Sequence, residues 1–263
     1  MDRRALGLLG LLAALWGSSY MFIKIGLEDH LSPGAIVFTR TALASVALLP
    51  IALRRGALAG LRGRLGWVAV LALVQVAGPF LLISAGENHI SSGLAGVLVA
   101  SAPIFTAILA TFVDSSERSH GAALAGIAIG IVGVGLVLGV DLGDAGSALG
   151  GGVMVLVAGL GYAMGGFMVK QRLAAVDPIG TVTATMAISA LATLPLALLT
   201  APDAAPGIGT AGAMLVLGVG GTGIAFAIFY TLIAELGPAR ASLVAYVAPG
   251  FAVFYGVTLQ GEA

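Results

Sequence analysis

The side chain in this sequence with the clearest potential for chemistry is Arg40, which lies seven residues after Pro33 in the apolar stretch 31–53. If that stretch crosses a membrane, an arginine at this depth costs about 2.5–3.5 kcal/mol and needs a compensating interaction. Two interpretations remain open. Arg40 could face a watery cavity that holds an anionic group such as a carboxylate, or it could be a structural arginine that extends outward or binds helix-end carbonyls.

Other polar and aromatic side chains within the apolar stretches combine an apolar body with a hydrogen-bonding group. Together they would suit a pocket for a small amphipathic metabolite. For any single aromatic residue, anchoring at the membrane interface or core packing is the simpler explanation. The candidate substrate-binding residues, beside Arg40, are Trp16, Ser18, Tyr20, Gln75, Ser101, Tyr162, Tyr230 and Tyr246.

Two prolines occupy matching places in the chain, Pro103 after Ala102 and Pro249 after Ala248. Proline removes a helical hydrogen bond and clashes with the preceding turn, so each should kink or loosen its helix. Membrane helices tolerate proline in general, but the matched positions favour paired hinges.

Enzyme chemistry and bound metals find little support in the sequence. There is no cysteine, and the histidines at 30, 89 and 120 lack ligand spacing and have no nucleophile arranged beside them. The pattern Gly218-x-Gly220-x-x-Gly223 lies inside an apolar run rather than between a strand and a helix, so it indicates small-residue packing. We therefore expect no catalysis, no metal and no cofactor.

Proton coupling is harder to place, because no carboxylate or histidine is expected to be buried within the apolar stretches. Glu87 and Glu235 lie near the ends of two of them and are the only candidate proton sites. Facilitated diffusion or exchange therefore remains as plausible as proton antiport.

The elements that must position these residues are membrane helices. The chain has 263 residues, of which 59% are apolar and only 9% charged, with a mean hydropathy of +1.09. This composition is typical of an all-α polytopic membrane protein. Counting stretches of about 20 residues predicts nine spans: 5–27, 31–53, 65–86, 90–113, 119–140, 148–170, 178–200, 209–234 and 238–259.

The basic residues indicate how these spans are oriented. Short loops rich in lysine and arginine stay in the cytoplasm, and a cytoplasmic N-terminus places ten of the 12 there: Arg3, Arg4, Arg54, Arg55, Arg62, Arg64, Arg118, Lys170, Arg172 and Arg240. We expect an integral protein of the bacterial cytoplasmic membrane. The net charge of zero gives no reason to expect nucleic acid as a partner.

The sequence also contains an internal duplication with an offset of about 146 residues. WGSSYMFIK at 16–24 corresponds to YAMGGFMVK at 162–170, and both Ala-Pro pairs are followed by a glutamate, Glu117 and Glu262. An odd number of spans in each copy would make the copies antiparallel, as in many secondary transporters. The predicted repeats are residues 5–140 and 148–263.

In these features the chain resembles the EamA family of the drug/metabolite transporter superfamily. The resemblance rests on WGSSYMFIK, on Pro33 with Arg40, and on the duplicated Ala-Pro and glutamate. It implies ten helices in two inverted five-helix repeats around a central cavity. The chain departs from this pattern in two ways: Thr185 stands where the second copy would repeat Arg40, and the sequence ends before a tenth helix, which leaves the second repeat with four.

The function that this resemblance implies is secondary transport by alternating access, as an exporter of small metabolites such as amino acids. The alternative is a non-transporting membrane sensor or assembly partner on the same scaffold. Such a protein usually carries a soluble output domain, and no predicted loop exceeds about a dozen residues. Whether the chain forms a homodimer is left open by the sequence.

Overall fold

The computed structural model describes residues 2–118, 121, 126, 128–130, 132, 146–202 and 204–260, and every regular element in these ranges is a helix. Eight helical spans are long and apolar enough to cross a membrane: Arg3–Glu28, Pro33–Arg54, Leu65–Gly86, Ser92–Val113, Gly146–Arg172, Pro178–Leu199, Ile208–Leu236 and Pro238–Leu259. They confirm the all-helical fold and match eight of the nine predicted spans. Most of the predicted span 119–140, together with His120 and Glu262, lies outside the described residues.

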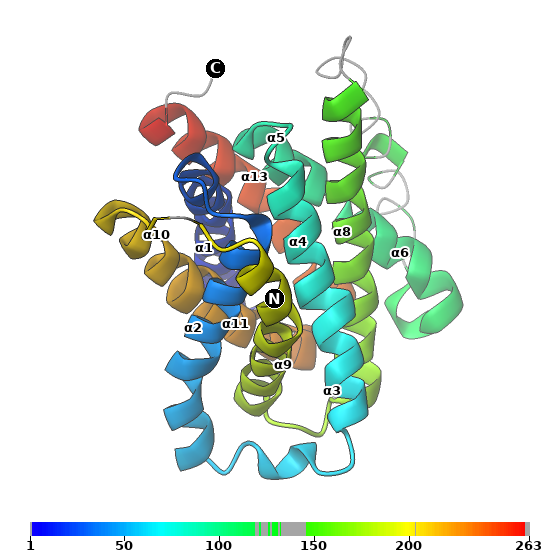
Figure 1. Ribbon diagram of the computed structural model, residues 1–263. Helices are drawn as coiled ribbons and strands as arrows, with labels where there is room; N and C mark the ends of the chain where they lie inside the picture. Colours follow the sequence, from blue (N-terminus) through cyan, green and yellow to red (C-terminus); the bar gives the residue numbers. More distant parts are fainter. Residues whose placement is uncertain are drawn as a thin grey trace.

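Figure 1 shows the helices packed as a single bundle. Four spans are single uninterrupted helices: α1 (Arg3–Glu28), α2 (Pro33–Arg54), α8 (Gly146–Arg172) and α9 (Pro178–Leu199). The other four are interrupted: α3 (Leu65–Leu71), η2 (Ala72–Ala77) and α4 (Gly78–Gly86); α5 (Ser92–Val99) and α6 (Ala102–Val113); α10 (Ile208–Gly218), η4 (Val219–Ile224) and α11 (Ala225–Leu236); α12 (Pro238–Ala241), α13 (Val244–Tyr255) and η5 (Gly256–Gln260). Two short 3-10 turns, η1 (Ala59–Leu61) and η3 (Ser115–Glu117), lie in connections.

The centre of the bundle is the antiparallel pair α2 and α9, whose starts are set by the same local signal. The Ser32 hydroxyl and the Asp177 carboxylate each accept a hydrogen bond from the first turn of the following helix, and a proline follows each cap. The glycines that follow allow close packing, because a Cβ on Gly34 would overlap Leu196 and one on Gly180 would overlap the Ala57 carbonyl.

Two contacts mark one end of the bundle. Arg4 at the start of α1 pairs with Glu235 at the end of α11, and Arg64 before α3 donates to the Arg172 carbonyl at the end of α8. We call this the basic end, and it includes the connection from α2 to α3, which is seen at the bottom of Figure 1. The opposite, acidic end carries Asp29. It follows that α8 runs in the direction opposite to α1.

A π-helical segment interrupts the third span of each half, η2 in the first and η4 in the second. Gln75 and Thr222 are each the fourth residue of their segment. Such segments are rare, and they are often found at functional sites. The same irregular feature thus occurs at the same place in both halves, which makes Gln75 and Thr222 candidate site residues.

The breaks near the two predicted hinge prolines are not equivalent. Pro103 lies in the first turn of α6, directly after the break between α5 and α6 at Ala100 and Ser101. Pro249 lies inside α13, and the break in that span comes earlier, at Ser242 and Leu243. The interruption thus lies directly before Pro103 in one span and several residues before Pro249 in the other, and α13 continues through its proline.

Candidate functional site

A narrow cavity of ≈ 50 Å³ lies in the middle of the bundle, between the two halves of the chain. This volume holds only a few water molecules, since each takes up about 30 Å³ in liquid water. Four of the predicted site residues line it: Trp16, Tyr20, Arg40 and Tyr162. They come from α1, α2 and α8, and we call this space the central cavity.

Arg40 lies against the central cavity with only 3% of its surface exposed. Its Nε donates to Thr222 Oγ1 at 2.9 Å, and its guanidinium carbon lies 3.7 Å from the centre of the Phe80 ring. Thr222 is oriented in turn by donating to the Leu217 carbonyl at 2.8 Å. Arg40 is thus buried within the bundle, and its Nε binds a side-chain hydroxyl rather than a helix-end carbonyl.

The charge of Arg40 is not neutralised by a direct ion pair. Within the described ranges, no carboxylate lies close enough to Arg40 for a salt bridge, and its two terminal amino groups form no hydrogen bond. A guanidinium has five N–H donors, and the outer ones match the two oxygens of a carboxylate. The geometry therefore leaves a buried cation with free donors beside a cavity.

Gln75 is fully buried and joins the two halves of the bundle from the other π-helical segment. The Tyr230 hydroxyl donates to Gln75 Oε1 at 2.7 Å, and Gln75 Nε2 donates to the Tyr162 carbonyl at 3.4 Å. Gly165 makes room for this side chain, because a Cβ there would overlap it. Gln75 and Tyr230 thus lie behind the wall of the central cavity rather than on its surface.

Aromatic rings form part of the apolar wall, beside aliphatic side chains such as Ile23 and Val99. Trp16 stacks on Tyr162 with ring centres 6.3 Å apart and meets the edge of Phe229 at 4.9 Å. Phe226 contacts both Trp16 and Phe80. Sequence reasoning missed Phe80, Phe229 and Thr222. The only available signal was the glycine run 218–223, which packs Thr222 close to α1 and α2.

Three predicted site residues lie away from the central cavity. Ser18 donates to the Leu15 carbonyl, and its neighbour Ser19 lines the cavity instead. Tyr246 is 46% exposed, on the outer surface of α13. Ser101 is buried at the break between α5 and α6, beside Gly159. Ser18 and Tyr246 are thus not among the residues that line the central cavity.

The two candidate proton sites differ sharply in environment. Glu87 is fully buried and directly follows α4, just beyond the span 65–86. Its Oε2 accepts from the Ser92 hydroxyl at 3.1 Å, Lys24 donates to its main-chain carbonyl, and it interacts electrostatically with Arg40. Glu235 is instead at the surface, where Arg4 binds its carboxylate at 3.0 Å.

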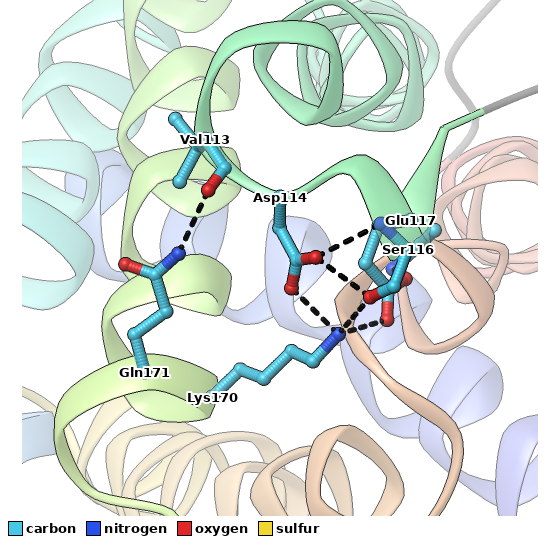
Figure 2. A network of polar contacts seen from close by, with 7 residues as sticks. Val113, Asp114, Ser116, Glu117, Lys170 and Gln171 are labelled. Carbon is cyan, nitrogen blue, oxygen red and sulfur yellow. Dashed lines mark hydrogen bonds and ion pairs between the residues drawn. The ribbon is translucent and has the colours of Figure 1, made fainter.

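A network of charges closes the basic end of the bundle (Figure 2). The Lys170 ammonium lies 2.8 Å from Asp114, 2.7 Å from Glu117 and 3.0 Å from the Ser116 hydroxyl. Glu117 also accepts from the main-chain N–H of Ala239 at 3.1 Å. This basic-end clamp, formed by Asp114, Glu117 and Lys170, joins the end of α6 to α8 and α12.

The basic-end clamp should make the stability of the fold depend on pH. Hydrogen bonds from Lys170 and Ser116 lower the pKa of Asp114 to about 2 from its usual 3.8. Because the folded pKa is depressed, the contact stabilises the fold fully above about pH 4 and less as the pH falls toward 2. The melting temperature of Asp114→Asn should therefore lie below that of the wild type by a constant difference from pH 5 to 8. That difference should shrink below pH 4, and a difference that varied between pH 5 and 8 would contradict this assignment.

The fold and the site together define a polytopic helical membrane protein with a mainly apolar cavity between two halves of the chain. The chain belongs to the EamA-like transporter family, whose model matches residues 5–139 and 149–263. This confirms the family inferred from the sequence motifs.

Individual relatives agree with this assignment. The chain is 30% identical to the uncharacterized inner membrane transporter YedA of Escherichia coli (strain K12), over 99% of this chain and 85% of that protein. It is 33% identical to a probable terminal-alkyne amino-acid exporter of Streptantibioticus cattleyicolor, over 51% of this chain and 44% of that protein. A crystal structure with 21% identity shares the fold with a TM-score of 0.75, covering 97% of this chain and 89% of its own.

Proposed function

We propose that this membrane transporter is a secondary exporter of small amino-acid-like metabolites, and that Arg40 binds the carboxylate of the substrate. The observation that carries the proposal is the buried guanidinium of Arg40, which borders the central cavity without a salt bridge to any described residue. Burying such a charge costs several kcal/mol, and a substrate carboxylate would offset that cost whenever the site is occupied.

The remaining wall of the cavity supports an amphipathic substrate. Trp16, Tyr162 and Phe229 provide a flat apolar surface, while Tyr20 and Ser19 add hydroxyl groups. An apolar pocket with a few polar groups that converge is the usual form of a small-molecule site. The relative named as an amino-acid exporter supports the same substrate class.

The small size of the central cavity supports alternating access. A space of ≈ 50 Å³ is too small for an amino acid, and separation of the two halves would make room for one. We place the moving units in two inverted repeats, residues 5–140 and 148–263, with Pro103 and Pro249 as hinge positions. The break before Pro103 supports a hinge in the first repeat, and the break at Ser242 and Leu243 provides flexibility in the second.

Orientation and coupling complete the proposal. The gathering of basic residues at one end favours a cytoplasmic N-terminus in the bacterial inner membrane. Of the two candidate proton sites, the buried Glu87 is the better placed, because it interacts electrostatically with Arg40. Facilitated diffusion and exchange are the alternatives to proton coupling, and a non-transporting sensor is the alternative to transport.

Expression in bacterial cells tests export directly. Cells that overproduce the protein and are loaded with an L-leucine-containing dipeptide should release the leucine formed inside them faster than cells that carry the Arg40→Gln variant. The measurement is the initial rate of leucine appearance in the medium at matched levels of membrane protein. Equal rates for the two strains and for cells without the protein would refute export of this substrate class.

A further inference from the structure

A second cavity, of ≈ 410 Å³, lies at the basic end of the bundle. It is enclosed by the ends of α8 and α11 and the start of α9, and its wall is mainly apolar, with Leu173 and Ile233 among the lining residues. Its volume falls within the range of about 300–1,000 Å³ that is usual for small-molecule sites. The space large enough for a metabolite is thus at this end rather than in the central cavity. We call it the basic-end cavity.

The charged groups on its wall favour a cation. Lys170 and Glu117 both line the cavity, and Asp114 pairs with the same lysine. Two carboxylates against one ammonium leave one surplus negative charge. All three N–H bonds of Lys170 are engaged, by Asp114, Glu117 and Ser116, whereas each oxygen of Glu117 accepts only one hydrogen bond and can accept another.

Neither of two nearby arginines forms an ion pair with the clamp. The guanidinium of Arg172 lies 4.5 Å from the centre of the Trp67 ring, and Arg118 donates to the Thr111 carbonyl at 2.8 Å. Glu117 is the one carboxylate among the described residues that line the cavity, so it is the acceptor best suited to a ligand amine.

The two cavities are linked through one hydrogen-bonded chain. Tyr230 lines the basic-end cavity, and its hydroxyl donates to Gln75. Gln75 donates to the carbonyl of Tyr162, whose ring lines the central cavity. A ligand in the basic-end cavity thus lies one side chain away from the residues that hold the central wall in place.

We propose that the basic-end cavity is a second binding site, which takes the protonated amine and apolar body of an amphipathic small molecule on its way to or from the central cavity. The proposal rests on the proposed function and deepens it. An amino acid carries both charges, and the protein would recognise its ammonium group near Glu117 and its carboxylate at Arg40.

Photolabelling of the purified protein in lipid nanodiscs tests this site. The probe is the diazirine analogue of L-leucine, and mass spectrometry locates the labelled residues. We expect label on the segments around Leu173 and Ile233, displaced by hexylamine but not by hexanoate, which has the same number of carbon atoms. Ala174 lies at the exposed rim, and Ala174→Phe should reduce the label at least about fivefold. This factor corresponds to about 1 kcal/mol, the lower end of the free-energy cost of overpacking. The adjacent Ala175→Phe, which does not line the cavity, should leave it unchanged.

The outcomes separate this proposal from the proposed function. Label at this site that persists in Arg40→Gln, with hexylamine displacing it, supports the second site whether or not the protein moves leucine. Absence of label there, equal labelling of the two alanine variants, or displacement by hexanoate as effective as by hexylamine overturns it. Leucine flux without label at the basic end would keep the transporter and remove the second site.

Discussion

Replacing Arg40 with glutamine should reduce protein-mediated leucine flux by at least about 30-fold, because removing one partner of a buried charge pair costs about 2–5 kcal/mol. The fold should not suffer. Arg40 forms no salt bridge with any described residue, so the substitution removes a buried charge rather than a stabilising ion pair. We expect the melting temperature of the variant to equal or exceed that of the wild type.

Two further variants sharpen this prediction. Arg40→Lys keeps the charge but loses the planar pair of donors, so its flux should lie between those of the wild type and Arg40→Gln. Arg55→Gln makes the same substitution at the exposed end of the same helix and should transport normally. Wild-type flux in Arg40→Gln would contradict the role of this residue, whatever its melting temperature.

Replacing Gly237 with alanine should lower the free energy of unfolding by about 2–6 kcal/mol. Gly237 has φ +83° and ψ 162°, a conformation essentially restricted to glycine that costs other residues about 1–3 kcal/mol. An added Cβ would also overlap the Glu117 carboxylate, and overpacking of this kind costs about 1–3 kcal/mol more. The change would push Glu117 away from Lys170 and from the start of α12, and so weaken the basic-end clamp.

Gly56 provides the matched control, since it has a similar φ of +62° and no atom near the position of its Cβ. Gly56→Ala should therefore show the conformational cost alone. The measurement is the unfolding free energy of both variants, obtained by titration with denaturing detergent in mixed micelles. If the two variants lose the same stability, the contact between Gly237 and Glu117 contributes nothing.

The spans and their starts could be predicted because they depend on local sequence. A run of about 20 apolar residues has one main structural outcome in a membrane, and Ser32-Pro33 and Asp177-Pro178 are strong start signals. Arg40 could also be recognised from the sequence as a candidate site residue, since a charged residue within an apolar stretch requires an explanation of its own.

The facing of individual side chains could not be predicted in the same way. Lipid is as apolar as the protein interior, so the sequence of a membrane helix does not show which side is packed. Tyr246 and Tyr20 look alike in their apolar stretches, yet one is on the outer surface and the other lines the cavity. The contact between Arg40 and Thr222 was hidden for another reason, because Thr222 comes from the opposite half of the chain. It lies in a π-helical segment whose one local signal, the glycine run 218–223, does not indicate its partner.

Counterflow in vesicles that contain only the purified protein tests the central claim most directly. Vesicles loaded with unlabelled L-leucine are diluted into a trace of radiolabelled L-leucine, and the label accumulated inside is followed over time. Our account predicts a transient, saturable accumulation that is absent with Arg40→Gln and is inhibited by other apolar amino acids. Vesicles of the wild-type protein that take up no more label than protein-free vesicles, for leucine and for the apolar amino acids tested in the same way, would contradict it.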